Sequence, residues 1–393
     1  MTEQAKVPAI RFAGFTDPWE QRKFGDCFEF LKSNTLSRAG LNGENGTARN
    51  VHYGDILIKF GDCLDGERSD LPFITDDTVL PKFAGSILRE GDVIFADTAE
   101  DEAAGKCVEL RKLPKEPTIS GLHTIPARPR FFFGTGYLGH YLNSDAYHRQ
   151  LLPLMQGIKV ISVSKAALQD TQVRFPGLSE QAAIGAALSE IDNLITLHQR
   201  KYDKLVIFKK SMLEKMFPKD GESVPEIRFA GFTDPWEQRK FSEIVDVCSG
   251  RDYKHLDEGP IPVYGTGGYM TSVSEALSHN RDAIGIGRKG TIDKPYLLKA
   301  PFWTVDTLFY AIPKSDINLE FALCSFLNVD WKSKDESTGL PSLSKESINE
   351  TVLSVPNVVE QNHLGNFFAD LDRLITLHQR KRLSIRQRSP VWS

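Results

Sequence analysis

The sequence predicts a mixed α/β protein with a pseudo-twofold internal repeat, in which two unlike domains are joined by two long helices that pair as a coiled coil. Three observations predict this. The stretch IRFAGFTDPWEQRKF, Ile10–Phe24, recurs letter for letter at Ile227–Phe241. The segment LSEQAAIGAALSEIDNLITLHQRK, ending at Lys201, aligns without a gap with VVEQNHLGNFFADLDRLITLHQRK, ending at Lys381. The stretches that these repeats enclose, about 25–175 and 242–355, show no evident similarity, so two constant frames hold two different inserts.

The second repeat has the spacing of a coiled-coil seam. Seam residues recur at alternating steps of four and three, which is a heptad pattern, so two such helices are expected to pair. The expected seam residues are Ile184, Leu188, Ile191, Ile195, His198, Tyr202 and Leu205 in the first copy and Leu364, Phe368, Leu371, Ile375 and His378 in the second. Phe208, Met212 and Phe217 extend the apolar face, and Pro218 ends it. The two histidines are interpreted as packed seam residues rather than metal ligands.

The first repeat, which we call the entry segment, resembles a turn that leads into a short helix. Asp17 can cap such a helix, Pro18 suits its first position and Glu20 its third. Its aromatic residues would anchor each insert to the shared frame. The inserts contain strand-like runs at 51–60, 91–97, 282–291 and 302–312 and helix-like runs at 273–279 and 319–328.

These features divide the chain into five segments. They are the entry segment with the first domain (1–175), the first long helix (176–218), a linker with the second entry segment (219–241), the second domain (242–355) and the second long helix with an altered end (356–393).

Composition excludes several classes of protein. The five cysteines form no CxxC pair, so neither a zinc ribbon nor a disulfide framework is indicated. The first residues lack the apolar core of a signal peptide, and no apolar run reaches the roughly 18 residues that a membrane span needs. We therefore expect a cytoplasmic protein without membrane contact. The net charge of −4 does not by itself indicate a nucleic-acid-binding protein.

No catalytic signature stands out. The DPW triplet of the entry segment has one proline, whereas the amino-methyltransferase loop D/N-P-P-W/Y/F needs two. The chain has no phosphate-binding G-x-x-x-x-G-K-[ST] loop, and GIGRKGT, Gly285–Thr291, resembles one only superficially. Asp316, Asp330 and Lys332 fit a nuclease-like D…DxK pattern, but such triplets are common by chance. We predict no catalytic residue and no metal site.

Recognition is the function that the repeat favours. A duplicated frame with unlike inserts presents two different binding surfaces with pseudo-twofold symmetry, which suits a two-part target on duplex DNA. Neither insert is basic overall, with 17 Lys and Arg against 20 Asp and Glu in the first and 11 against 16 in the second. DNA binding therefore needs cations gathered on one face or a basic partner.

The expected DNA contacts lie in glycine-containing loops that mix lysine or arginine with polar residues. These contacts are Lys32, Ser33, Asn34, Thr35, Arg38, Lys59, Arg251, Lys254, Thr266, Gly267, Gly268, Tyr269, Arg288 and Lys289.

With these motifs in view, the chain resembles the specificity subunits of type I restriction-modification enzymes. The resemblance rests on the two entry segments, the two EQ…LITLHQRK helices, GRKGTIDKP…FWTVDTLFY in the second insert and NVHYGDILIKFGD in the first. It covers nearly the whole chain.

The resemblance implies a function for each part. Each insert would be a target recognition domain that reads one half-site of double-stranded DNA, and the helices would form an antiparallel coiled coil that sets the spacer. Two modification subunits, which methylate adenine, and the restriction subunits would assemble on this chain. S-adenosylmethionine, ATP and Mg²⁺ would bind to those partners, and this chain would hold no cofactor and catalyse nothing.

One departure from the pattern concerns the end of the second helix. After the second LHQRK the sequence becomes RLSIRQRSPVWS, which places Arg382 at the seam position of Tyr202 and Pro390 soon after. Four alternatives stay open: a modification-only subunit, a silent copy without a restriction partner, a purely structural coiled-coil adaptor without DNA contact, and a stand-alone nuclease or methyltransferase. The last predicts binding of S-adenosylmethionine or a divalent metal to the purified chain.

Overall fold

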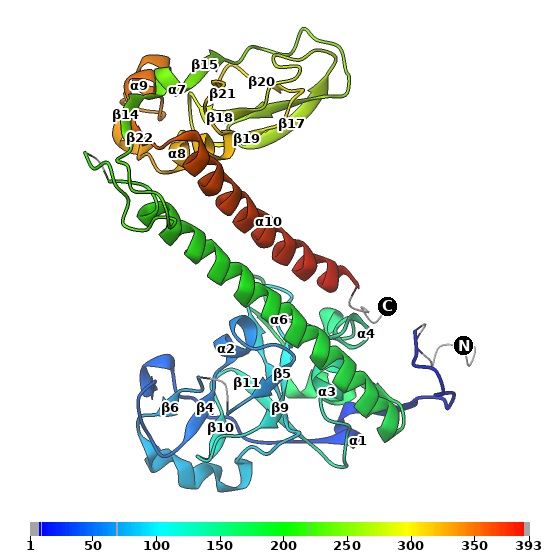
Figure 1. Ribbon diagram of the computed structural model, residues 1–393. Helices are drawn as coiled ribbons and strands as arrows, with labels where there is room; N and C mark the ends of the chain where they lie inside the picture. Colours follow the sequence, from blue (N-terminus) through cyan, green and yellow to red (C-terminus); the bar gives the residue numbers. More distant parts are fainter. Residues whose placement is uncertain (1–7, 9, 68–69, 220, 389–393) are drawn as a thin grey trace. The chain divides into compact units, whose positions relative to one another are not determined.

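The computed structural model describes residues 8, 10–67, 70–219 and 221–388 (Figure 1). The chain divides into two compact units, one made of residues up to 197 with the chain from 382 onward, the other of residues 198–381. Each unit contains a mixed α/β domain and parts of two long helices, α6 (Leu178–Lys215) and α10 (Val358–Arg388). The predicted mixed α/β fold with two long helices is confirmed.

The N-terminal domain of the first unit contains two principal sheets. Its strands are β2 (Phe28–Phe30), β3 (Leu41–Asn42), β4 (Arg49–Val51), β5 (Cys63–Asp65), β6 (Phe73–Ile74), β7 (Val93–Ala96), β8 (Thr98–Ala99), β9 (Cys107–Lys112), β10 (Thr118–Ser120), β11 (Thr124–Pro129) and β12 (Ile161–Ser162). Its helices are α1 (Phe24–Cys27), α2 (Tyr53–Ile58), α3 (Tyr137–Asn143), α4 (Asp145–His148) and α5 (Lys165–Asp170), with 3-10 turns η2 (Arg38–Gly40), η3 (Asp77–Ser86) and η4 (Leu152–Leu154). The sheet orders are β2-β11-β7-β9-β5 and β10-β4-β6-β3, and β8 pairs with β12.

Strand β7 lies at the centre of this domain because both of its faces are covered. Val93 and Phe95 belong to one apolar cluster, together with Phe24 of α1. Ile94 and Ala96 point to the opposite face and belong to a second cluster. Successive side chains of a strand alternate between faces, so the apolar run VIFA is what a strand buried on both sides requires.

The C-terminal domain of the second unit repeats this arrangement. Its strands are β15 (Val245–Ser249), β16 (Ile261–Gly265), β17 (Gly268–Val273), β18 (Ala283–Gly287), β19 (Tyr296–Leu298), β20 (Trp303–Thr304) and β21 (Leu308–Pro313). Its helices are α7 (Phe241–Ile244), α8 (Leu319–Leu327) and α9 (Lys345–Glu350), with the 3-10 turn η5 (Trp331–Lys334). The sheet orders are β15-β21-β18-β19 and β17-β16-β20. As β11 does between β2 and β7, β21 pairs antiparallel with β15 and β18, and β20 pairs parallel with β16 as β10 does with β4.

The entry segment forms a strand where the sequence suggested a helix. Glu20–Lys23 is β1, which pairs antiparallel with β13 (Gln172–Phe175) at the end of the first insert. Glu237–Lys240 is β14, which pairs in the same way with β22 (Val352–Val355). The prediction that the short helix begins at Pro18 is wrong, because the helix begins six residues later, at Phe24, and at Phe241 in the second copy. The strand pair therefore joins each entry segment to the last residues of the insert that follows it.

A buried ion pair fixes each entry segment to its long helix. Arg11 donates from Nε and Nη2 to Glu180 of α6 at 2.6 Å, and Glu180 is 2% exposed. Arg228 forms the same pair with Glu360 of α10 at 2.7 and 2.8 Å. Each arginine also donates to the carbonyl of the aspartate six residues later. The entry segment thus anchors each insert to the frame as expected, but an ion pair makes this contact, whereas the sequence pointed to the aromatic residues.

The glutamine that follows each glutamate joins the helix to its domain. Gln181 accepts from the Gly134 amide and donates to the Pro176 carbonyl. Gln361 accepts from the Asn318 amide and donates to the Pro356 carbonyl. The repeated dipeptide EQ is therefore conserved between the two copies of this chain because the glutamate binds the entry segment and the glutamine binds the insert.

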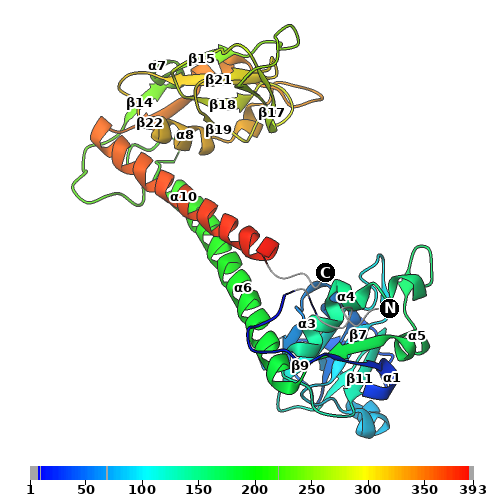
Figure 2. The same ribbon diagram turned by 90° about the vertical axis from the view of Figure 1, so that its right-hand side faces the viewer.

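Within the second unit, α10 packs antiparallel to the C-terminal part of α6 (Figure 2). His198 meets His378 with 2.8 Å between their Nδ1 atoms, and Lys209 pairs with Asp372 at 2.6 Å. Residue numbers thus rise along one helix as they fall along the other. His198 and His378 are the same residue of the two repeats, as expected for a pair on a pseudo-twofold axis.

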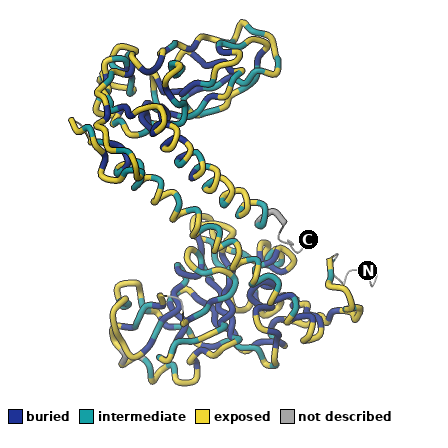
Figure 3. Tube along the Cα trace, viewed as in Figure 1, coloured by how far each residue is buried: buried dark blue, intermediate teal, exposed yellow. Residues whose placement is uncertain are grey.

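Burial along the helices follows the predicted seam. In α10, Leu364, Phe368 and Leu371 are buried, and Leu205 of α6 packs against the same apolar cluster. The other predicted seam residues of α6 and α10 are half-buried except Ile184, which is buried. Much of the remaining helix surface is exposed (Figure 3). The altered tail remains helical through Arg388, and the predicted break at Pro390 lies outside the described residues.

Two sequence interpretations within the inserts are wrong. The run 51–60 contains helix α2 in place of a strand, because His52 caps it by accepting from the Gly54 amide. The run 273–279 forms no helix. The strands at 91–97 and 282–291 and the helix at 319–328 are confirmed, whereas 302–312 is divided into β20 and β21 by a turn. Among the described residues, no helix is long and apolar enough to cross a membrane.

Removing the charge of Glu360 should destabilise the protein strongly. In Glu360→Gln the Arg228 guanidinium, 11% exposed, loses its anionic partner, and breaking a buried pair typically costs about 3 kcal/mol or more. Asp370→Asn on the same helix is the matched control, because its pair with Arg373 is exposed and should change the free energy of unfolding by less than about 1 kcal/mol. Urea denaturation measures both variants, and equal effects would contradict the anchoring role.

The His198–His378 contact should weaken in acid. Burial, and then the charges of His198, Lys201 and Lys381, lower the pKa of His378 below its usual 6.5. The unfolded chain therefore binds a proton at His378 more readily than the folded chain does. The stability that the neutral ring supplies is complete above about pH 6.5 and is lost as the pH falls through the folded-state pKa. His378→Asn should reduce the difference in melting temperature between about pH 7.5 and 5.5. An unchanged difference would show that the ring does not titrate in this range.

Candidate nucleic-acid interface

In the C-terminal domain, one turn gathers three of the loops that the sequence singled out. We call Thr304–Thr307 the central turn of this domain. The Arg251 amide donates to the Thr304 carbonyl at 2.9 Å, and the Arg288 amide donates to the Thr307 carbonyl at 2.8 Å. The Val305 amide donates to the Tyr264 carbonyl at 3.0 Å. The loops after β15, β16 and β18 thus meet at the same edge of the domain.

These loops present most of their polar groups to solvent. Arg251, Lys254, Arg288 and Lys289 are exposed, and Tyr269, at the tip of the β16–β17 hairpin, is 64% exposed. Of the remaining predicted residues in the hairpin, Gly267 is exposed, while Thr266 and Gly268 are half-buried. Gly268 has a φ of +105°, a conformation that favours glycine in this tight connection.

The N-terminal domain contains the same turn with a different sequence. Its central turn is Ser120–His123. The Asn34 amide donates to the Ser120 carbonyl at 2.8 Å, the Gly121 amide donates to the Val51 carbonyl at 2.8 Å, and the Asp97 amide donates to the His123 carbonyl at 3.0 Å. These three bonds match those of the other domain one for one.

Strand register confirms the equivalence of the two turns. In the parallel pairs, Val51 lies opposite Ser120, just as Tyr264 lies opposite Thr304. In the antiparallel pairs, Ala96 lies opposite Thr124, just as Gly287 lies opposite Leu308. Asn34 and Asp97 therefore occupy the places that Arg251 and Arg288 occupy in the C-terminal domain.

The structure separates the predicted DNA contacts of the N-terminal domain into two groups. Lys32, Thr35, Arg38 and Lys59 are exposed, and Ser33 is half-buried. Asn34 is 3% exposed, and its side-chain amide donates to Asn50 and to the Ser120 carbonyl. Its side chain supports the turn, which corrects the expectation that it lies on the surface.

Arg38 and Lys59 share one carboxylate. Both lie near Asp55, which is buried and pairs with Arg38 at 2.8 and 2.9 Å and with Lys59 at 3.2 Å. Burial alone would raise the pKa of Asp55, but these two cations lower it overall. Burial, and then Arg38, lower the pKa of the adjacent His52. Two exposed positive charges of the N-terminal domain are thus held by one buried negative charge.

Sequence reasoning missed Asp97 and His123, which also lie at the central turn. The Nδ1 atom of His123 is 3.4 Å from Asp97, and His123 adopts a φ of +53°, unusual for a residue with a side chain. No sequence motif marks either residue, because their place is defined by backbone hydrogen bonds.

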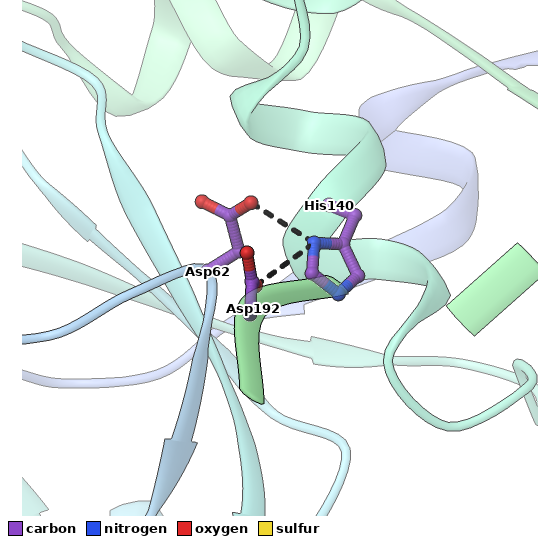
Figure 4. Close-up of side chains that lie close together, drawn as sticks. All are labelled: Asp62, His140 and Asp192. Carbon is purple, nitrogen blue, oxygen red and sulfur yellow. Dashed lines mark hydrogen bonds and ion pairs between the residues drawn. The ribbon is translucent and has the colours of Figure 1, made fainter. Parts of the chain in front are cut away.

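A second cluster of polar side chains lies where the N-terminal domain meets α6. His140 Nδ1 is 2.9 Å from Asp62 and 3.9 Å from Asp192 (Figure 4). Histidine and carboxylates are ligand types for divalent metals, and their ligand atoms lie within 4.8 Å of one another. Asp62, however, also accepts from Asn143 at 2.9 Å, so its oxygens already have protein donors.

The repeat explains this cluster as a helix-docking contact. Tyr137 and Phe321 occupy equivalent places beside Trp19 and Trp236, which aligns His140 with Cys324. Asp192 aligns with Asp372, whose partner is Lys209. The residue aligned with Lys209 in the second repeat is Ser389, which carries no charge. In the first unit the partner of the helix carboxylate is therefore supplied by the domain, as His140, and we assign no metal to this cluster.

Comparison with known proteins finds a family model that matches the C-terminal part of the chain. Residues 233–387 match the family model of the type I restriction modification DNA specificity domain. This match begins within the second entry segment and continues through the C-terminal domain and α10. This part of the chain is thus similar to the DNA specificity domain of type I restriction-modification enzymes.

Individual relatives agree with this family. The chain is 30% identical over 105 residues to the type I restriction enzyme MjaVIII specificity subunit of Methanocaldococcus jannaschii, and 24% identical over 228 residues to the putative MjaX specificity subunit of the same organism. These matches cover 26% and 56% of this chain and span only 25% and 51% of the two relatives.

Solved structures share the fold. An S subunit of a type I restriction-modification system from M. genitalium superposes with a TM-score of 0.62 at 16% identity, with 96% of each chain covered. A chain from a structure of type I restriction-modification complex assembly and conformational transition gives 0.51 at 14% identity, covering 94% of this chain and 95% of that one. The specificity-subunit fold thus extends over nearly all of this chain.

The close packing around the central turn can be tested at Gly250. A Cβ added there would overlap the carbonyl oxygens of Val305 and Thr304, so Gly250→Ala should lower the free energy of unfolding by about 1–3 kcal/mol. Gly267→Ala is the matched control, because no heavy atom lies within 4 Å of a Cβ at that position. Denaturation of both variants measures the difference, and a fully stable Gly250→Ala would contradict the described approach of the loop to the turn.

Proposed function

We propose that this chain is the DNA sequence-specificity subunit of a type I restriction-modification complex. Each domain binds one half of a two-part target on double-stranded DNA. The long helices set the spacer between the half-sites and bind the methyltransferase subunits.

The observation that carries this proposal is the pair of equivalent central turns. Two domains without evident sequence similarity share three backbone hydrogen bonds at the turn and the same attachment to the frame. A constant skeleton with different exposed side chains is what two readers of different short sequences require. The family match of residues 233–387 supports DNA as the target.

The edge formed by each central turn is the proposed DNA surface. In the C-terminal domain it carries Arg251, Lys254, Arg288 and Lys289 on exposed loops. Arginine and lysine contact phosphates and the acceptor atoms of guanine, and the glycine-rich hairpin allows a close backbone approach. The excess of acid elsewhere in the chain favours a basic partner that shares the phosphate contacts.

The long helices carry a repeated apolar surface that suits partner subunits. Leu194 and Leu197 of α6 are 37% and 45% exposed, and Leu374 and Leu377 of α10 are each 43% exposed. All four belong to the identical octapeptide LITLHQRK. Exposed leucines at the same positions of both repeats favour two equivalent docking sites, one for each of two modification subunits.

We assign the methylation and cleavage reactions to the partner subunits. The sequence contains neither a phosphate-binding loop nor the two-proline methyltransferase loop. We therefore propose that S-adenosylmethionine, ATP and Mg²⁺ act on the modification and restriction subunits, and that this chain selects the site.

Mapping of methylated adenine tests this function. The chain is co-expressed with the modification subunit of its own operon in a host that lacks adenine methylation, and N6-methyladenine is located by long-read sequencing. A two-part motif with a fixed gap is expected, and it should be absent when the modification subunit is expressed alone. Methylation without a two-part motif, or a motif that does not depend on this chain, would contradict the proposal.

A further inference from the structure

The two central turns have the same backbone but opposite side-chain chemistry. In the C-terminal domain, the residues that bond to the turn are Arg251 and Arg288, both exposed. In the N-terminal domain, the equivalent residues are Asn34, whose side chain is buried, and Asp97, whose side chain is 27% exposed. The same place in the fold thus offers hydrogen-bond donors in one domain and a carboxylate acceptor in the other.

The sequences of the equivalent loops extend this contrast. The loop after β18 reads GRKGTIDK and begins with two adjacent cations. The segment after β7, which includes the short strand β8, reads DTAEDEAAGK and contains four carboxylates, Asp97, Glu100, Asp101 and Glu102. Because both loops leave equivalent strands and meet equivalent turns, the difference belongs to the part of the fold that varies between the readers rather than to the frame.

We propose that the two domains read their half-sites with opposite hydrogen-bond polarity: Arg288, assisted by Arg251, selects guanine, whereas Asp97 selects a base with an exocyclic amino group in the major groove, cytosine or adenine. This inference rests on the proposed function and adds the base class and the selecting residues. Guanine presents the acceptors O6 and N7, which match two guanidinium donors, while cytosine N4 and adenine N6 donate to a carboxylate.

The side-chain geometry supports these roles. The Arg288 guanidinium carbon lies 5.8 Å from the centre of the Phe309 ring, and one nitrogen is 3.4 Å from the Asp306 carbonyl, so the group is exposed and only lightly held. Asp97 uses Oδ1 for both Thr98 and His123. Both of these contacts, made within the described part of the chain, leave Oδ2 of Asp97 unused. This second oxygen can therefore accept a hydrogen bond from the amino group of a base.

Selection of duplexes from a random library by the purified complex of this chain with its modification subunit tests the inference. The wild-type complex should enrich a two-part motif with guanine in one half-site. Arg288→Ala should reduce the preference for that guanine by at least about tenfold and leave the other half-site and the spacer unchanged. Arg288→Lys, which keeps donors for O6 and N7, should retain part of the preference.

Asp97→Ala provides the reciprocal measurement. It should relax one cytosine or adenine position in the other half-site and leave the guanine preference intact. Lys345→Ala is the matched control for loss of a cation, because Lys345 is exposed on α9, which packs against α7 and β15. This control should preserve both half-sites.

The outcomes separate the inference from the function on which it rests. If the wild-type complex enriches no two-part motif, the proposed function fails and the inference fails with it. If the motif appears but Arg288→Ala binds the same sequence with uniformly lower affinity and a shallower salt dependence, Arg288 contacts phosphate and the inference is overturned. A wild-type motif without guanine in the half-site that Arg288→Ala affects would also overturn it.

Discussion

The structure depends most on the buried ion pair between each entry segment and its long helix. A carboxylate that is 1–2% exposed requires a charged partner, and the guanidinium that pairs with it also binds a carbonyl of its own segment. The pair therefore fixes where the chain enters each domain, and the strand pairs β1–β13 and β14–β22 fix where it leaves. The identical entry segments exist because two domains must be attached in the same way to two copies of one helix.

This attachment frees the inserts from resembling each other. Once the entry strand, the exit strand and the EQ dipeptide are in place, the frame makes few further demands on the sequence of the domain. The central turns show that the domains nevertheless keep one skeleton, since their shared bonds use backbone atoms that any side chain allows. Specificity can then diverge at a few exposed positions, such as Asp97 and Arg288, without changing the fold.

Sequence reasoning succeeded where a pattern extended over many residues. The heptad steps predicted both long helices, and the run GDVIFAD predicted the buried strand β7. It failed where one local bond decides the outcome. His52 caps a helix in a run whose β-branched and aromatic residues resemble a strand, and the first entry segment forms a strand because β13, about 150 residues later, supplies its partner.

The candidate site was predictable only in part. The glycine-rich loops around Arg251 and Arg288 were visible in the sequence, but nothing in it showed that they meet at one turn. The burial of Asn34 and the place of Asp97 follow from backbone bonds between distant segments, which composition and spacing do not encode. The same holds for His140. Its contact with Asp192, which docks the helix on the domain, is recognised only when the two repeats are aligned.

The central claim is that one frame positions two independent readers in equivalent ways. It is tested most directly by a chimera in which residues 242–355 replace residues 25–175, so that both frames hold the second insert. Methylated adenine is then mapped after co-expression with the modification subunit. We predict a motif of two inverted copies of the second half-site with the wild-type spacer. A folded chimera that binds the modification subunit but methylates the wild-type asymmetric motif, or no two-part motif, would contradict the account.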